Sequence, residues 1–163
     1  MIIGLISDTH NKLPHRAIEI FQCVDMILHA GDIGEAYILG KLNQIAPTRA
    51  VYGNTDMYGL ANELPGHLSL NIEGIEFLLI HNIGNMRDFV WKIKRGDFHP
   101  EPQVIVHGHT HRPQYEKYQS YLFINPGSAS QPRHGYPTSV GLLEVSEGKV
   151  KDFELVEIGK KTE

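Results

Sequence analysis

Aspartate, asparagine and histidine side chains of the kind that bind metal ions recur in five short clusters along this sequence. Each cluster follows a short apolar run, which is typical of a buried strand that ends in a polar loop. Strand ends of α/β sheets meet at one edge, where such folds build their sites. The clusters are therefore predicted to converge. Their candidate ligands are Asp8, His10, Asp32, Asn54, His81, His109 and His111.

The residue types indicate which metals these ligands would hold. A mixture of histidine nitrogen and carboxylate or amide oxygen favours transition metals over Mg²⁺ or Ca²⁺. Seven ligands are too many for one tetrahedral ion, but they suit two ions about 3.5–4 Å apart that share one carboxylate. We expect two divalent ions per chain, Mn²⁺ first, with Ni²⁺, Co²⁺, Fe²⁺ or Zn²⁺ as alternatives.

Charge counting suggests the class of substrate. Two divalent ions carry four positive charges, whereas Asp8 and Asp32 supply only two negative ones. A hydroxide that bridges the ions would leave one net positive charge. The site is therefore expected to attract a small phosphate ester rather than a neutral amide.

The composition limits the class of protein. At 163 residues the chain is expected to form one domain over 1–163. Its net charge of -4 predicts no dedicated nucleic-acid surface and no attraction to anionic membranes. No run approaches the ~20 apolar residues of a membrane span, and the N-terminus lacks the pattern of a signal peptide. The single cysteine, Cys23, excludes an internal disulfide and favours the cytoplasm.

The pattern of predicted secondary structure changes along the chain. The first part alternates strand and helix, which predicts parallel strands with right-handed crossovers. The second part is rich in hairpin signals, such as Glu73-Gly74 between two apolar runs. The predicted strands are 2–7, 25–29, 48–52, 67–72, 75–80, 103–106, 114–118, 121–125, 140–145 and 150–155. The predicted helices are 14–22, opened by Pro14, 35–45 and 85–96.

The order of the motifs resembles that of the calcineurin-like metallophosphoesterase superfamily. Asn125-Pro126-Gly127-Ser128, Pro132-Arg133 and the short length further resemble its small single-domain phosphodiesterases of bacteria and archaea. The resemblance runs from about residue 1 to 156. It implies a four-layer α/β/β/α sandwich with a di-metal site at one edge of the sheets. The motifs in chain order are Asp8-x-His10, Gly31-Asp32, Gly53-Asn54-x-Asp56, His81 and Gly108-His109-x-His111.

The resemblance also implies roles for the seven ligands. One ion would be held by Asp8, His10, Asp32 and His111, and the other by Asp32, Asn54, His81 and His109. Asp32 would bridge the two ions. The implied activity is that of a phosphodiesterase that uses a hydroxide held by the metals. His10 and Asn54 would then stabilise the developing charge, and Asn54 would also touch the substrate phosphate.

The chain departs from the superfamily pattern at two positions. Many relatives carry, at the position of Thr55, a histidine that is thought to protonate the leaving group. A threonine hydroxyl cannot act as an acid near neutral pH, so esters with poor leaving groups should suffer most. Asp56 then loses its usual partner. The second departure, Asn82 in place of a common glycine, is expected to alter only a loop.

Other conspicuous residues receive structural interpretations. Cys23 is predicted to be a small buried hydrophobe and Trp91 to pack in the core. Gly127-Ser128 is predicted to form a turn rather than a nucleophile elbow. Arg133 could meet a substrate phosphate or pair with a loop carboxylate. Among the remaining histidines, His29 and His107 are predicted to be buried supports, and His15, His67, His99 and His134 to lie on the surface.

Two alternatives to a phosphodiesterase remain open. The eukaryotic retromer subunit resembles this fold and acts as a non-catalytic scaffold, although a scaffold has no need for all seven ligands. A phosphomonoesterase is disfavoured by the absence of an acid at Thr55. We also expect a homodimer, because small relatives often associate and because Tyr115, Tyr118 and Tyr121 are predicted to be exposed.

Overall fold

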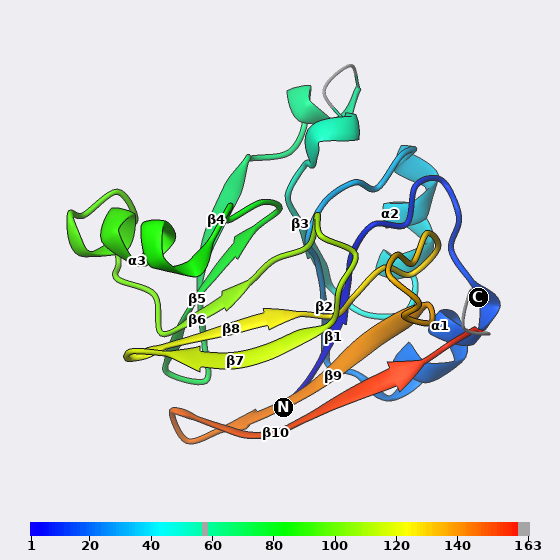
Figure 1. The fold of residues 1–163 in the computed structure, drawn as a ribbon. Helices are drawn as coiled ribbons and strands as arrows, with labels where there is room; N and C mark the ends of the chain where they lie inside the picture. Colours follow the sequence, from blue (N-terminus) through cyan, green and yellow to red (C-terminus); the bar gives the residue numbers. More distant parts are fainter. Residues whose placement is uncertain (57–58, 160–163) are drawn as a thin grey trace.

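Two five-stranded sheets pack face to face at the centre of the molecule (Figure 1). The structure is a computed structural model that describes residues 1–56 and 59–159. The first sheet, in the order β10-β9-β1-β2-β3, contains β1 (Ile2–Ile6), β2 (Met26–His29), β3 (Thr48–Ala50), β9 (Ser139–Ser146) and β10 (Lys149–Glu157). The second sheet, in the order β4-β5-β6-β8-β7, contains β4 (His67–Ile72), β5 (Ile75–Ile80), β6 (Val104–Val106), β7 (Gln114–Tyr118) and β8 (Tyr121–Asn125).

Helices cover the outer face of each sheet. α1 (His15–Ile20) and α2 (Ala36–Asn43) pack on the first sheet, and α3 (Met86–Lys94) packs on the second, at the left of Figure 1. Short 3₁₀ helices also form at Phe21–Cys23, Asn54–Asp56 and Leu60–Asn62. The predicted four-layer α/β/β/α arrangement is confirmed. Among the described residues, no helix is both long enough and apolar enough to span a bilayer.

Burial on both faces explains why the central strands read as continuous apolar runs. In β1, Ile3 and Leu5 point into the core between the sheets, whereas Ile6 points toward α1 and α2. In β5, Phe77 packs in the same central core, and Leu78 points the other way, toward α3. Alternate residues of each central strand therefore serve two different cores.

Parallel pairing gives the molecule one functional edge. β1, β2 and β3 are parallel to one another in the first sheet, and β5, β6 and β8 are parallel in the second. Parallel strands end at the same edge, so the loops that follow them are neighbours. This arrangement positions the ligand clusters identified in the sequence.

The helices are shorter than predicted. α2 ends at Asn43 instead of residue 45, because Ala46 precedes Pro47 and a residue before proline disfavours helical geometry. The chain tightens there, with Ile45 N–H donating to Leu42 O at 2.9 Å. Pro14 is the residue that precedes α1, so the first helical residue is His15.

Three predictions of burial are wrong. Cys23 is exposed, because the change to a 3₁₀ turn at Phe21–Cys23 leaves Phe21 as the residue that packs inward. Trp91 is 61% exposed, since α3 buries Phe89, Val90 and Ile93 and leaves Trp91 on the solvent side. Tyr121 is buried and donates its hydroxyl to Glu101.

A tight contact between β1 and the first helical layer generates the first prediction. A Cβ atom added at Gly4 would lie 2.9 Å from Phe21 Cδ1, and the Phe21 ring is fully buried. Gly4→Ala must therefore displace the ring, and it should lower the free energy of unfolding by about 1–3 kcal/mol. Urea denaturation measures this change.

The matched control is Gly40→Ala in α2, where an added Cβ would meet nothing within 4 Å. This variant should raise the free energy of unfolding by about 0.5–1 kcal/mol, because alanine favours the helix more than glycine does. A Gly4→Ala variant as stable as the wild type would show that the packing of the Phe21 ring does not require a glycine at position 4.

Candidate metal centre

The loops of both sheets meet at the predicted edge. Asp8 N–H donates to Gly31 O at 3.0 Å, which joins the loops after β1 and β2. Gly108 N–H donates to His81 O at 3.0 Å, which joins the loops after β5 and β6. The His81 side chain then reaches across to Ala30 O in the first sheet, 2.7 Å from Nδ1. The predicted convergence of the clusters is therefore present in the structure.

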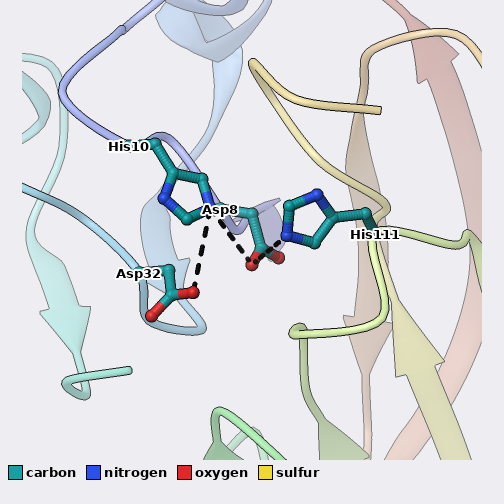
Figure 2. A group of neighbouring side chains, drawn as sticks. All are labelled: Asp8, His10, Asp32 and His111. Carbon is teal, nitrogen blue, oxygen red and sulfur yellow. Dashed lines mark ion pairs between the residues drawn. The ribbon is translucent and has the colours of Figure 1, made fainter. Parts of the chain in front are cut away.

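Four of the predicted ligands form one compact group, shown in Figure 2. One donor atom from each lies within 4.8 Å of all the others. His111 Nε2 lies 3.1 Å from Asp8 Oδ1, and His10 Nε2 lies 3.9 Å from the same oxygen. His10 Nε2 is also 3.7 Å from Asp32 Oδ2. The group consists of Asp8, His10, Asp32 and His111.

The remaining three ligands form a second group on the other side of Asp32. His81 Nε2 lies 3.3 Å from Asp32 Oδ2 and 3.1 Å from Asn54 Oδ1. Asn54 Oδ1 is in turn 3.0 Å from His109 Nδ1. The same oxygen, Asp32 Oδ2, therefore faces His10 in one group and His81 in the other.

Hydrogen bonds orient both carboxylates. Asp8 Oδ2 accepts from Ser7 Oγ at 2.7 Å and from His109 N–H at 3.2 Å. Asp32 Oδ1 accepts from Thr55 N–H at 2.9 Å. In each carboxylate one oxygen is thus held by the surrounding loops. The other oxygen, Asp8 Oδ1 or Asp32 Oδ2, is directed toward the histidine nitrogens.

Two histidine rings are oriented in the same manner. His81 Nδ1 pairs with Ala30 O, and His111 Nδ1 pairs with Gln131 O. An N–H that donates to a carbonyl leaves the opposite ring nitrogen, Nε2, with its lone pair toward the site. This outer support is the arrangement that metal-binding histidines usually have.

Buried polar atoms without partners test whether the site fits a metal. Asp8 Oδ1 and His10 Nε2 are buried and have no hydrogen-bond partner among the described residues. Leaving a buried polar group unsatisfied costs about 1–3 kcal/mol, and more for a charged group. A cation bound between these atoms would satisfy both. The mixed nitrogen and oxygen donors therefore fit a divalent transition metal.

The backbone of the site adopts a conformation that residues other than glycine rarely have. Five of the seven candidate ligands have positive φ angles, namely Asp8 (55°), His10 (42°), Asp32 (53°), His109 (68°) and His111 (58°). Such residues cost of order 1–3 kcal/mol each and gather at functional sites. The strain lets each loop turn sharply enough to direct its side chain into the centre.

Two motif glycines allow the loops to approach one another. A Cβ at Gly53 would lie 2.1 Å from Asp32 Oδ1, and a Cβ at Gly108 would lie 1.9 Å from Ser7 Oγ. Any side chain at these positions would push apart the loops that hold the carboxylates. The glycines in Gly53-Asn54 and Gly108-His109 are therefore required for packing.

Opposing effects set the pKa values of the site. Burial favours neutral Asp32, but hydrogen bonds from His81 and from Thr55 N–H outweigh it and hold the pKa of Asp32 well below its usual range. Burial also opposes protonation of His81 and His111, yet the nearby carboxylates of Asp32 and Asp8 raise the pKa of both rings. A bound cation would take the place of these protons, so its affinity should fall as the pH falls.

The other two histidines of the centre behave differently. Burial is the largest effect on His10 and His109, and it lowers the pKa of both. A neutral ring keeps a free lone pair on its ligating nitrogen. His10 and His109 are therefore ready to bind a cation near neutral pH without first losing a proton.

His29 and His107 support the site from behind, as predicted. Burial lowers the pKa of each ring to about 4. His29 Nδ1 accepts from Gly31 N–H at 3.2 Å, so its Nε2–H donates to Thr9 Oγ1 at 3.0 Å. Thr9 Oγ1 donates onward to Ile33 O at 2.8 Å. This chain ties the loop after β1 to the loop after β2.

Three supporting residues were missed as contributors to the site. Ser128 and Ser130 each donate a hydroxyl to Asp8 O at 3.1 Å. Asn125 Nδ2 donates to Gly108 O at 2.9 Å. The turn predicted at Gly127-Ser128 therefore supports the backbone of Asp8. The only signal in the sequence was the Asn125-Pro126-Gly127-Ser128 motif, which resembles that of the small phosphodiesterases.

Asp56 has a structural role that the sequence did not reveal. Its Oδ2 accepts from Gly53 N–H at 2.9 Å and from Ile33 N–H at 3.1 Å. Its Oδ1 accepts from Gly34 N–H at 2.9 Å. The buried carboxylate thus joins the loop that carries Asp32 to the loop that carries Asn54.

Replacement of this carboxylate by an amide is the second prediction. In Asp56→Asn, one oxygen becomes an NH₂ group that faces a backbone N–H, so a buried donor loses its acceptor. The free energy of unfolding should fall by about 1–3 kcal/mol, as measured by chemical denaturation. Asp97→Asn, which removes an exposed pairing with Arg95, should leave the free energy of unfolding close to that of the wild type. Equal losses in the two variants would contradict the bridging role of Asp56.

Comparisons with known proteins agree with this geometry. A family model for the calcineurin-like phosphoesterase superfamily domain matches residues 1–148. A probable metallophosphoesterase from Methanothermobacter thermautotrophicus is 34% identical over 165 residues, which cover 98% of this chain and 94% of that protein.

Solved structures share the fold. A novel archaeal phosphodiesterase superposes with a TM-score of 0.74 at 28% identity, covering 96% of this chain and 100% of the other. Vacuolar protein sorting 29 from Cryptosporidium parvum superposes with a TM-score of 0.74 at 20% identity, covering 98% of each chain. The second likeness concerns the fold alone. From the family match and the relative that is similar over nearly its whole length, the chain belongs to the calcineurin-like phosphoesterase superfamily.

Proposed function

We propose that this protein is a phosphodiesterase that uses two divalent transition-metal ions, with Mn²⁺ as the first candidate. The observation that carries the proposal is the position of Asp32 Oδ2, 3.7 Å from His10 Nε2 and 3.3 Å from His81 Nε2. One carboxylate oxygen between two sets of ligands suits a pair of adjacent ions. When bound, such a pair generates a nucleophile from water near neutral pH and neutralises charge on the phosphate.

The residues of the chain then divide the remaining work. Asn54 turns Oδ1 toward His81 and His109, so its NH₂ group is available to donate to a phosphate oxygen. His10, which is neutral and only partly exposed, would stabilise developing charge at the opposite side. These are the two residues to which we assign catalytic roles.

Of the two roles considered for Arg133, contact with the substrate is better supported than a pairing that stabilises the loop. Its side chain is exposed, and it forms no ion pair with any carboxylate in residues 1–56 and 59–159. Its positive charge opposes protonation of His111 and therefore acts to lower the pKa of that ring. A free guanidinium beside the centre suits a phosphate, which it can bind through two parallel hydrogen bonds.

The alternatives differ from this proposal in what they require of the site. A non-catalytic scaffold like the vacuolar sorting protein shares the fold. Such a scaffold needs neither ligand loops with a strained backbone nor buried polar atoms without hydrogen-bond partners. A phosphomonoesterase would need an acid for a poor leaving group, and Thr55 supplies none. The archaeal phosphodiesterase among the solved structures supports the diester assignment. A single domain over 1–163 and a homodimer stay predictions.

The shared carboxylate gives the third prediction. Wild-type protein loaded with Mn²⁺ should approach two ions per chain by elemental analysis. Asp32→Asn removes a charge from both groups while keeping the shape of the side chain. It should therefore reduce the occupancy of both ions and lower turnover of an aryl diester by more than about 10²-fold, since loss of a ligand's hydrogen-bond partner alone typically costs 10–100-fold.

Asp152→Asn is the matched control, because Asp152 is exposed and, within the part of the chain that the structure describes, its carboxylate bonds only to the neighbouring Phe153 N–H. Its metal content and turnover should equal those of the wild type. A wild-type protein that reproducibly binds no metal would contradict the proposed centre. An Asp32→Asn variant with two ions and full activity would contradict the bridging role alone.

The missing acid gives the fourth prediction. Thr55 is exposed and donates its backbone N–H to Asp32 Oδ1. Aryl diesters, whose phenolate leaves unaided, should be cleaved readily, and rates should fall steeply as the pKa of the leaving group rises. Thr55→His should flatten this dependence and raise the rates of poor leaving groups by up to about 10²-fold.

Thr55→Gln separates proton donation from side-chain size, because glutamine is comparably bulky but does not titrate. It should leave the steep dependence unchanged. A wild-type rate that is indifferent to leaving-group pKa, with chemistry rate-limiting, would show that another residue donates the proton. Asp56 would be a poor candidate, since both its oxygens accept from backbone N–H groups.

A further inference from the structure

A cavity of ≈ 400 Å³ lies beside the metal centre and includes none of its seven proposed ligands. Glu116 and Tyr118 are two residues apart in β7, so their side chains point to the same face of the sheet, and Tyr118 packs against the core beneath α3. Alternating side chains of a strand point to opposite faces, so the cavity lies on the outer face of the second sheet, next to the start of α3. Its lining includes Ile83, Met86, His107, Thr110, Gln114 and Glu116.

The walls of this cavity are the loops that carry the second group of ligands. Ile83 follows His81 by two residues, and Thr110 lies between His109 and His111. The hydrogen bond from Gly108 N–H to His81 O joins the two loops. The cavity is therefore adjacent to the second group of ligands.

An ordered chain of hydrogen bonds forms one side of the cavity. The His107 Nε2–H donates to Gln114 Oε1 at 2.9 Å. This contact fixes the amide, whose Nε2 donates to Glu116 Oε2 at 3.2 Å and approaches Met86 Sδ at 3.4 Å. Glu116 has no cationic partner among the described ion pairs.

Part of the cavity lining is apolar. Ile83, Met86 and Pro113 contribute hydrocarbon or thioether surface, and Ile83 is almost fully buried. Cavities of ~300–1,000 Å³ that combine apolar walls with a few placed polar groups are typical of binding sites for organic ligands. The Glu116 carboxylate would accept hydrogen bonds from hydroxyl or amine groups of such a ligand.

We propose that this cavity binds one alcohol arm of the diester substrate, namely a ring-containing alcohol that carries hydroxyl or amine groups. The inference rests on the proposed phosphodiesterase function and names the class of substrate. The ring packs against Ile83, Met86 and Pro113, and its polar groups bond to Glu116. The other arm of the diester is the leaving group and stays outside the cavity.

Kinetics with two diesters of the same leaving group test this assignment. Methyl p-nitrophenyl phosphate has no ring in its retained arm, whereas thymidine 5′-(p-nitrophenyl phosphate) has a nucleoside there. Wild-type protein should prefer the nucleoside ester in kcat/KM. Met86→Trp fills the cavity, so the ratio of the two kcat/KM values should fall about tenfold, which corresponds to ~1.4 kcal/mol.

Lys117→Trp is the matched control. Lys117 lies on the other face of β7 and lines a separate cavity with Tyr115, Leu122 and Val150, so the ratio should equal that of the wild type. An unchanged ratio in Met86→Trp, with both esters still hydrolysed, would overturn the subsite and leave the phosphodiesterase function intact. Failure of the metal-loaded wild type to hydrolyse either ester would overturn the function itself.

Binding can also be followed without turnover. The chain contains four methionines, so ¹³C-methyl labelling of methionine gives a simple NMR spectrum. Titration with thymidine should shift the methyl resonance of Met86 and leave that of Met26, which packs between the sheets, unchanged. No shift at Met86 would overturn the subsite. A shift in a protein that hydrolyses neither ester would show a ligand pocket that does not serve catalysis.

Discussion

Two buried carboxylates impose the constraint on which the rest of the site depends. Asp8 and Asp32 are almost fully buried, and a buried charge is stable only when it is paired and hydrogen-bonded. Loop groups satisfy one oxygen of each, and the histidine nitrogens surround the other. The pKa of Asp32 is lowered and those of His81 and His111 are raised by the same contacts. A divalent cation would resolve this arrangement more completely than a proton does, because it would also satisfy Asp8 Oδ1 and His10 Nε2.

The fold supplies what this charge arrangement requires. Parallel strands in two packed sheets end at one edge, so five separate loops can each contribute ligands without any loop being long. This convergence requires a left-handed backbone conformation at Asp8, Asp32 and His109. Glycines without side chains and a buried Asp56 that accepts three backbone N–H groups keep the loops in contact. Ligand geometry therefore depends on residues that never touch the proposed ions.

The chemistry proposed for this chain combines a complete set of metal ligands with the absence of a side chain that protonates the leaving group. Thr55 occupies the position where many relatives carry a histidine, and its backbone is already engaged by Asp32. Selectivity for good leaving groups then follows from the absence of a proton donor. The subsite proposed beside the loops of His81 and His109 would add a second source of selectivity, because it would favour a diester whose retained arm carries a ring.

The sequence by itself determined the order of the elements and the seven candidate ligands, and the resemblance of its motifs to the superfamily implied the layered fold. Apolar runs buried on both faces and polar strand ends are local patterns, and they can be read along the chain. Burial of single residues could not be read in this way. Trp91 and Cys23 are exposed and Tyr121 is buried, because the face that an apolar residue presents depends on where a turn tightens and which helix covers it. The clamp made by Asp56 and the cavity beside α3 were likewise decided only by tertiary structure. Each depends on distances between loops that are far apart in the chain, and residue types alone do not specify those distances.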